Sequence, residues 1–131
     1  MNAQRIAANI GENGCYFISL LRLVNAEYGA IRVYKQALSL GIIEEDCYVV
    51  NPPRLMGLVA GGRWSVEHKP ADYQTKPNEF EILRFERKTT TKTFAHFVVG
   101  DGQGNVEYDP LDDSNTVKYG KLVSKRIVRR I

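Results

Sequence analysis

The residues of this sequence best suited to do chemistry together are Cys15 and His96, which lie about 80 residues apart. Cys15 follows Gly14 at the start of a segment with helical apolar spacing. A thiol at a helix N-terminus feels a partial positive charge that favours the thiolate, the nucleophilic form of cysteine. A neighbouring imidazole can take the thiol proton. This pair predicts a covalent, thiol-based chemistry, whereas a purely structural Cys15 would be a small buried apolar group.

His96 lies in an apolar segment that runs into a glycine-rich turn, and Asp109 follows that turn. If a β-hairpin turns at residues 102–103, residue 96 faces residue 109, and Asp109 can orient the imidazole. If the turn is at residues 101–102, Glu107 is opposite His96 instead. Both registers place a carboxylate beside the imidazole, and the simpler alternative is a histidine on the surface of a hairpin.

The remaining cysteine and histidine predict no second site. His68, with Asp72 nearby, lies in a polar segment and is expected at the surface, while Cys47 precedes apolar residues and is expected to be buried and inert. The two cysteines and two histidines lack the paired spacing of zinc ligands. We therefore expect neither a metal nor a cofactor.

The elements that must position these residues change in type along the chain. A helix is expected over residues 14–27, with Asn13 as its cap and Gly29 beyond its end. The other expected helices cover residues 30–40 and a short segment that Asn51-Pro52-Pro53 opens and Gly61-Gly62 closes.

Strands dominate the second half of the sequence. The expected strands cover residues 64–67, 80–86, 93–99 and 105–108, with a shorter one at 47–50 and a C-terminal segment, 122–128, that forms either a strand or a helix. Helices followed by antiparallel strands predict an α+β fold in which N-terminal helices pack on a C-terminal antiparallel β-sheet. The length suits a single domain over residues 1–131.

Composition excludes several classes of protein. Hydrophobic residues make up 44% of the chain and charged residues 25%, which predicts a folded soluble protein. The net charge is +3, and the basic run 121–130 is interpreted as a solvated face rather than a nucleic-acid surface. No signal-peptide pattern and no apolar run long enough to cross a bilayer is present, so no membrane association and a cytoplasmic location are expected.

Three motifs together resemble a known family. Gly14-Cys15 heads an apolar helix, His96-Phe97-Val98-Val99 forms a strand, and Tyr108-Asp109-Pro110 follows a glycine turn. In order and spacing this resembles the papain-like cysteine peptidases of the bacteriocin-leader-processing type, and small papain-like domains of phages and mobile elements. The resemblance implies a papain-like fold and a peptide or protein substrate. It also implies hydrolysis of a peptide, isopeptide or related amide bond through a thioester, with Cys15 as nucleophile, His96 as base and Asp109 as the orienting residue.

One position departs from that family. Such peptidases carry a glutamine six residues before the cysteine, which donates to the oxyanion, and this chain has Asn9 there. The resemblance thus assigns Asn9 to the oxyanion hole together with the Cys15 backbone N–H, with Glu12 and Asn13 as weaker candidates. Loss of one oxyanion donor costs ~10²–10³ in rate. The departure motivates an alternative, a non-catalytic papain-like binding module whose groove holds a protein or peptide partner.

Overall fold

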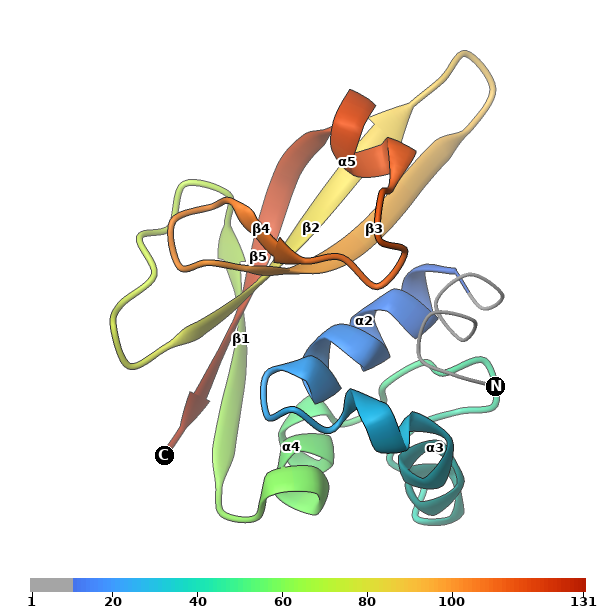
Figure 1. Ribbon diagram of the computed structural model, residues 1–131, viewed down its shortest axis with the longest axis vertical. Coiled ribbons are helices and arrows are strands. Elements are labelled where there is room, and N and C mark those ends of the chain that lie inside the picture. The colour runs from blue at the N-terminus through green and yellow to red at the C-terminus, as the bar shows by residue number, and fades with distance from the viewer. Residues whose placement is uncertain (1–10) are drawn as a thin grey trace.

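The computed structural model describes residues 11–131, and its elements change from helices to strands along the chain (Figure 1). The helices are α2 (Glu12–Arg22), the 3-10 helix η1 (Glu27–Gly29), α3 (Ala30–Ser39), α4 (Pro52–Ala60) and α5 (Asn115–Tyr119). The strands are β1 (Trp64–Pro70), β2 (Phe80–Lys88), β3 (Thr93–Gly100), β4 (Val106–Tyr108) and β5 (Lys121–Arg130). The α+β class is therefore confirmed.

Within residues 11–131, the five strands form one antiparallel sheet in the order β1-β5-β2-β3-β4. The C-terminal segment is thus a strand, and it lies inside the sheet between β1 and β2. Its basic run is only partly solvated. Lys125 is buried and pairs with the buried Glu81 at 3.0 Å, because alternate residues of an inner strand face opposite sides of the sheet.

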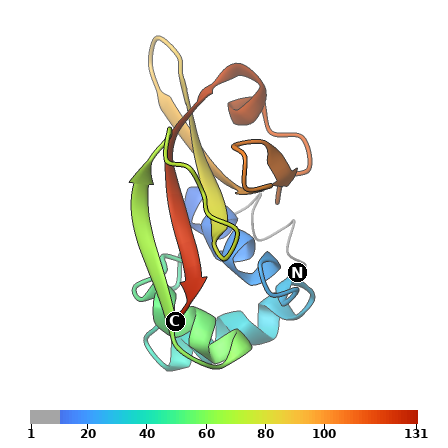
Figure 2. The same cartoon turned by 90° about the vertical axis from the view of Figure 1, so that its left-hand side faces the viewer.

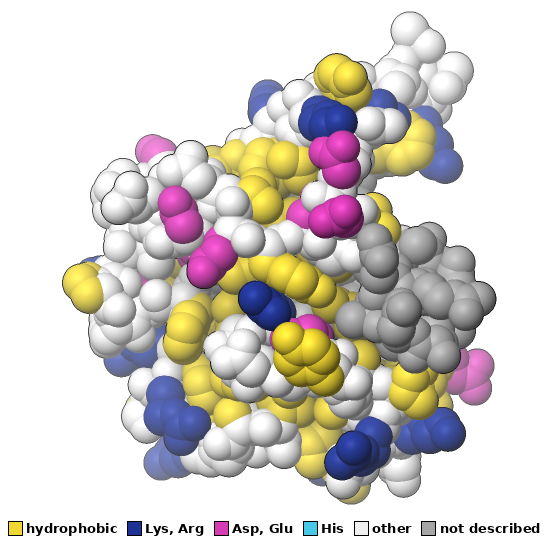
Figure 3. Space-filling model, viewed as in Figure 1, with side chains coloured by type: hydrophobic (Ala, Val, Ile, Leu, Met, Phe, Trp, Pro, Cys, Tyr) yellow, Lys and Arg dark blue, Asp and Glu magenta, His cyan; other side chains and the backbone are white. Residues whose placement is uncertain are grey.

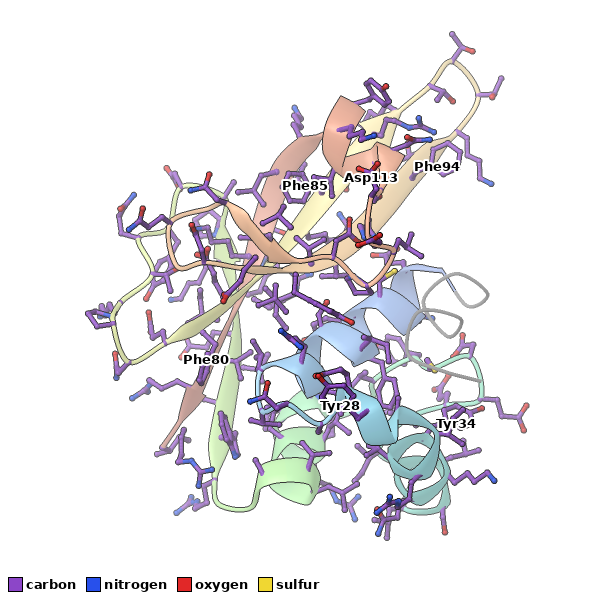
Figure 4. The ribbon with its side chains drawn as sticks, in the orientation of Figure 1. Tyr28, Tyr34, Phe80, Phe85, Phe94 and Asp113 are labelled. Atoms are coloured by element: carbon purple, nitrogen blue, oxygen red, sulfur yellow. The ribbon has the colours of Figure 1, made fainter. Side chains whose placement is uncertain are left out.

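The main core lies between the sheet and α2, α3 and α4, which pack together on one side of it (Figures 1 and 2). The helical spacing of α2 buries Phe17, Leu20 and Leu21 against sheet residues such as Ile82 and Val128. A second, smaller cluster of Leu83, Phe85 and Val98 is covered by α5 and the start of β5. Figure 4 shows Phe85 beside α5, at the end of the sheet away from α3 and α4.

The first helix differs from its prediction at both ends. It begins at Glu12 with Gly11 at the cap position, so Asn13 lies inside the helix and caps nothing. It ends at Arg22 because Asn25 adopts the left-handed conformation (φ 56) and Ala26 donates its N–H to Leu21. Asn25, not Gly29, therefore terminates this helix.

Elsewhere the observed elements agree with the predicted ones except in two places. The Asn51 side chain accepts from the Arg54 N–H and caps α4, as its position before Pro52 predicts. Residues 47–50 form no strand. Cys47 turns the chain with a positive φ of 67, which leaves one isolated bridge between Ile43 and Val49. The second exception is α5, a single short turn of helix that was not predicted.

On the face drawn in Figure 3, Lys and Arg side chains are scattered among acidic and apolar ones. In the described part of the chain, no helix has both the length and the apolar character needed to span a bilayer.

Candidate active site

The site begins where β4 stops covering the edge of β3. β4 pairs with β3 only at Val99 and Gly100, so it ends before it reaches the level of His96. Both predicted hairpin registers are wrong. Val99 pairs with Tyr108 and Gly100 with Val106, because a β-bulge at residue 107 shifts the pairing. The predicted contact is nevertheless present, since Asp109 follows β4 directly and its side chain reaches His96.

Asp109 is the most firmly held side chain of the site. Its Oδ1 lies 2.6 Å from Nε2 of His96 and accepts the Leu111 N–H at 2.8 Å, while Oδ2 accepts the Ser114 N–H at 3.1 Å. Burial disfavours the charged carboxylate. The hydrogen bond and charge of His96, together with the two backbone donors, outweigh burial and hold the pKa of Asp109 below its ordinary value. Asp109 is therefore an ionised acceptor at neutral pH.

The ionised state of Asp109 sets the orientation of His96. A carboxylate can only accept, so Nε2 of the imidazole donates to it. In the neutral ring the lone pair then lies on Nδ1, which is the nitrogen able to take a proton. His96 is only 2% exposed, so its neighbours fix the ring in place.

α2 packs against β3 at the level where β4 no longer pairs with that strand. The Ser19 hydroxyl donates to the carbonyl of Phe97 at 3.4 Å, and the backbone N–H of Phe97 donates to the Cys15 sulfur. The ring of Tyr16 packs on that of Phe97, with centroids 4.7 Å apart. Cys15 thus lies against the residue that directly follows His96 in β3.

The electrostatics of Cys15 oppose the expected thiolate. The side chain is 1% exposed, and burial raises its pKa to about 12, with the charges of Asp109 and Glu12 adding to the rise and the Phe97 N–H opposing it. These effects outweigh the lowering that was expected from the helix N-terminus, which weakens beyond the first turn, and Cys15 is the fourth helical residue. The resting form at neutral pH is therefore a neutral thiol.

The oxyanion donors predicted from the sequence are not assembled within residues 11–131. The Cys15 N–H donates to the carbonyl of Gly11 at 3.0 Å, inside the helix. Glu12 is paired with Arg84 at 3.0 Å, and the Asn13 side chain donates to Asp46 at 3.3 Å. Asn9, the first candidate, lies outside the described residues.

The remaining cysteine and histidine are held by other elements, Cys47 by the turn between α3 and α4 and His68 by β1. Cys47 is fully buried in its turn, and burial, followed by the charge of Asp46, raises its pKa to about 11. Neither cysteine is in a disulfide. His68 is exposed on β1. Among residues 11–131, no three His, Cys, Asp or Glu side chains come together as metal ligands.

Sequence reasoning missed the turn that holds Asp109. Ser114 donates its backbone N–H to Asp109, and its side chain caps α5 by accepting from Thr116 at 3.2 Å. A serine four residues after the Asp109-Pro110 pair is the signal that could have indicated it. The short α5 thereby fixes the position of the orienting carboxylate.

Comparison with known proteins relates nearly all of the chain to one family. Residues 1–130 match the model of a family described as "Protein of unknown function, DUF261". No curated protein matches the chain, and no solved structure does either. The matched range includes Cys15, His96 and Asp109, but the family description carries no activity.

Proposed function

The chain belongs to the DUF261 family, and we propose that it is a papain-like cysteine hydrolase that cleaves a peptide, isopeptide or related amide bond. The observation that carries the proposal is the buried His96–Asp109 pair, in which Nε2 is bound to a carboxylate and Nδ1 keeps its lone pair. The Cys15 thiol lies beside the next residue of the same strand. The substrate is a peptide or a protein, and the compartment is the cytoplasm.

The raised pKa of Cys15 selects a general-base form of the mechanism. Nδ1 of His96 takes the thiol proton as the sulfur bonds to the carbonyl carbon. The tetrahedral intermediate then expels the amine, to which His96 returns the proton, and a thioester remains on Cys15. Water attacks the thioester with His96 again as base, which releases the acid and restores the thiol. Asp109 holds the imidazole and stabilises the imidazolium formed in each half.

Oxyanion stabilisation depends on Asn9 in this proposal, because the Cys15 N–H is used within α2. One side-chain amide in place of two donors predicts a slow enzyme. The same observation favours a second function, a non-catalytic papain-like module that holds a protein or peptide partner. A buried neutral thiol suits packing as well as it suits chemistry.

Digestion of a proteome-derived peptide library, with new termini identified by mass spectrometry, separates the two functions. The full chain should generate a defined set of cleavages that Cys15→Ala abolishes and Cys47→Ala preserves. Cys47 is the matched control because it too is a buried thiol at the N-terminal half of the fold. Cleavage that survives Cys15→Ala would refute the nucleophile. If peptides bind to the protein and none of them is cleaved, the protein is the binding module instead.

A further inference from the structure

A pocket of about 330 Å³ adjoins the proposed site on the helix-facing side of the sheet. Glu12 and Tyr16 of α2 line it, and so do Phe97 of β3, Arg126 of β5 and Tyr48 from the segment before α4. Glu12 precedes Cys15 by almost one helical turn, Tyr16 follows it directly, and the Phe97 backbone bonds to its sulfur. A group bound in this pocket would therefore lie next to the thiol.

The pocket exists because the inner face of the sheet changes from apolar to charged at this level. Along β2 the inward position after Ile82 is Arg84, and along β5 the inward position next to Val128 is Arg126. Both guanidinium groups lie against the ring of Phe97, at 5.8 Å and 5.4 Å from its centroid. The apolar core ends here, and two cations lie beyond it, of which Arg126 lines the pocket.

Only one of these cations is neutralised by a carboxylate. Arg84 pairs with Glu12 at 3.0 Å and also with Glu86. Arg126 donates only to neutral oxygens, the Ser124 hydroxyl at 3.0 Å and the Lys125 carbonyl at 3.3 Å. Within the described part of the chain no carboxylate forms an ion pair with it.

Arg126 is also in a poorly solvated position. Burial lowers its pKa, and the charge of Arg84 acts in the same direction, against the opposing effects of Tyr16 and, last, of the Glu12 carboxylate. A guanidinium nonetheless stays protonated in proteins. A half-buried guanidinium that lies over the Phe97 ring and has no carboxylate in hydrogen-bond contact is a strong site for a planar carboxylate, which it can bind through two parallel N–H donors.

We propose that this pocket binds a carboxylate of the substrate, with Arg126 as its ion-pair partner. Walls made by the rings of Tyr16, Tyr48 and Phe97 would hold the carbon atoms that carry the carboxylate. The carboxylate belongs either to an Asp or Glu side chain or to a free C-terminus. As a statement about substrate choice, this inference rests on the proposed hydrolase function. As a statement about binding, it is independent of it.

Binding of four small probes to the Cys15→Ala protein tests the proposal without any chemistry at the sulfur. N-acetyl-glutamate amide carries only a side-chain carboxylate, and N-acetyl-alanine carries only a C-terminal one. Their neutral counterparts are N-acetyl-glutamine amide and N-acetyl-alanine amide. NMR titration should show at least one acid binding about tenfold or more tightly than its neutral counterpart, the effect of one charge-assisted hydrogen bond. The acid that does so identifies the source of the carboxylate.

Substitutions in the same background assign the effect to one residue. Arg126→Gln should reduce the acid-to-neutral affinity ratio to about 1, and Arg126→Lys should retain part of it because the charge remains. Arg129→Gln is the matched control, since Arg129 lies on the same strand but faces the other side of the sheet. Equal affinity for acids and neutral probes, or a ratio that survives Arg126→Gln, would overturn the proposal.

The two proposals fail separately. A carboxylate preference in the Cys15→Ala protein together with no cleavage of the peptide library would leave the pocket in place and remove the hydrolase. Cleavage of the library at sites without a carboxylate, combined with equal binding of the four probes, would support the hydrolase and refute the carboxylate pocket. A thermal melt of the Arg126→Gln protein excludes unfolding as the cause of lost binding, and Arg126→Lys decides the question if that variant does not fold.

Discussion

Asp109→Asn is the substitution that separates the two tasks of the carboxylate. Asp109 accepts from three donors, the His96 imidazole and the backbone N–H groups of Leu111 and Ser114. Asparagine keeps the shape but has one acceptor oxygen and one NH₂ group. Whichever way it is turned, at least one buried donor faces another donor.

The expected loss of stability follows from these bonds. A buried donor left without an acceptor costs about 1–3 kcal/mol, and the bonds that remain lose the contribution of the charge. Together these effects predict a loss of about 2–4 kcal/mol, which lowers Tm by roughly 10 °C in a domain of this size. The change is large because native domains are stabilised by only about 5–15 kcal/mol.

The same substitution should change Cys15 in the opposite sense. The charge of Asp109 is the second contribution, after burial, to the raised pKa of the thiol. Its removal should shift the pH profile of Cys15 alkylation to lower pH. Hydrolysis should nevertheless slow by about 10–100-fold, because His96 loses a charge-assisted hydrogen bond that stabilises the imidazolium.

Thermal unfolding and iodoacetamide alkylation, both in a Cys47→Ala background so that one thiol remains, measure these effects. Alkylation is followed by intact mass between about pH 7 and 11, where a buried thiol begins to ionise. If Asp109→Asn lowers Tm and leaves the alkylation profile of Cys15 unchanged, Asp109 only closes the turn before Pro110. If Tm changes by less than about 2 °C, the three hydrogen bonds do not stabilise the fold as argued.

Two further predictions concern the framework of the site. Gly120→Ala should destabilise the protein by several kcal/mol, because the added Cβ would overlap two backbone carbonyl oxygens, whereas Gly29→Ala has open space and should change the denaturation midpoint little. Equal midpoints in urea would contradict this. Glu81→Gln should cost about 3–5 kcal/mol at pH 7, because it leaves the buried Lys125 without a charged partner. Burial alone would raise the pKa of Glu81. Its hydrogen bonds and the charge of Lys125 have the larger effect together and hold the pKa below its ordinary value. The stability it contributes is therefore present at neutral pH and is lost as the pH falls through the folded-state pKa. The free energy of unfolding should thus decline more steeply below about pH 4.5 in the native protein than in Glu81→Gln, and parallel curves would refute the role of this charge.

The sequence pattern predicted those elements whose formation depends on residues close together in the chain. Helical spacing identified α2, and Asn51-Pro52 marked the start of α4, because apolar periodicity and capping act within a few residues. The strand that contains His96 was recognised for the same reason. The place of β5 between β1 and β2 was not predicted, since strand order depends on contacts between residues far apart in the sequence.

The details of the site depended on features with weak sequence signals. The bulge at residue 107 changed the hairpin register, and a bulge without a glycine leaves little mark in the sequence. Gly11 begins α2 without a side-chain cap, so Asn13 was the more conspicuous and the wrong choice. The contact between His96 and Asp109 was predicted in spite of this. Asp109 lies beyond the end of β4, and its side chain can reach His96 although the pairing of the two strands is shifted.

Labelling by electrophilic peptide probes is the most direct test of the proposed site. A panel of peptides with thiol-reactive ends, varied in side chain and including acidic members, is incubated with the native protein and with Cys47→Ala and His96→Ala. Intact mass and peptide mapping should show one adduct, on Cys15, in the native and Cys47→Ala proteins. It should form faster than with iodoacetamide, because a bound probe lets His96 take the proton during attack. His96→Ala should form none over the same time. An adduct on Cys47, or equal labelling of Cys15 with and without His96, would contradict the proposed nucleophile and base.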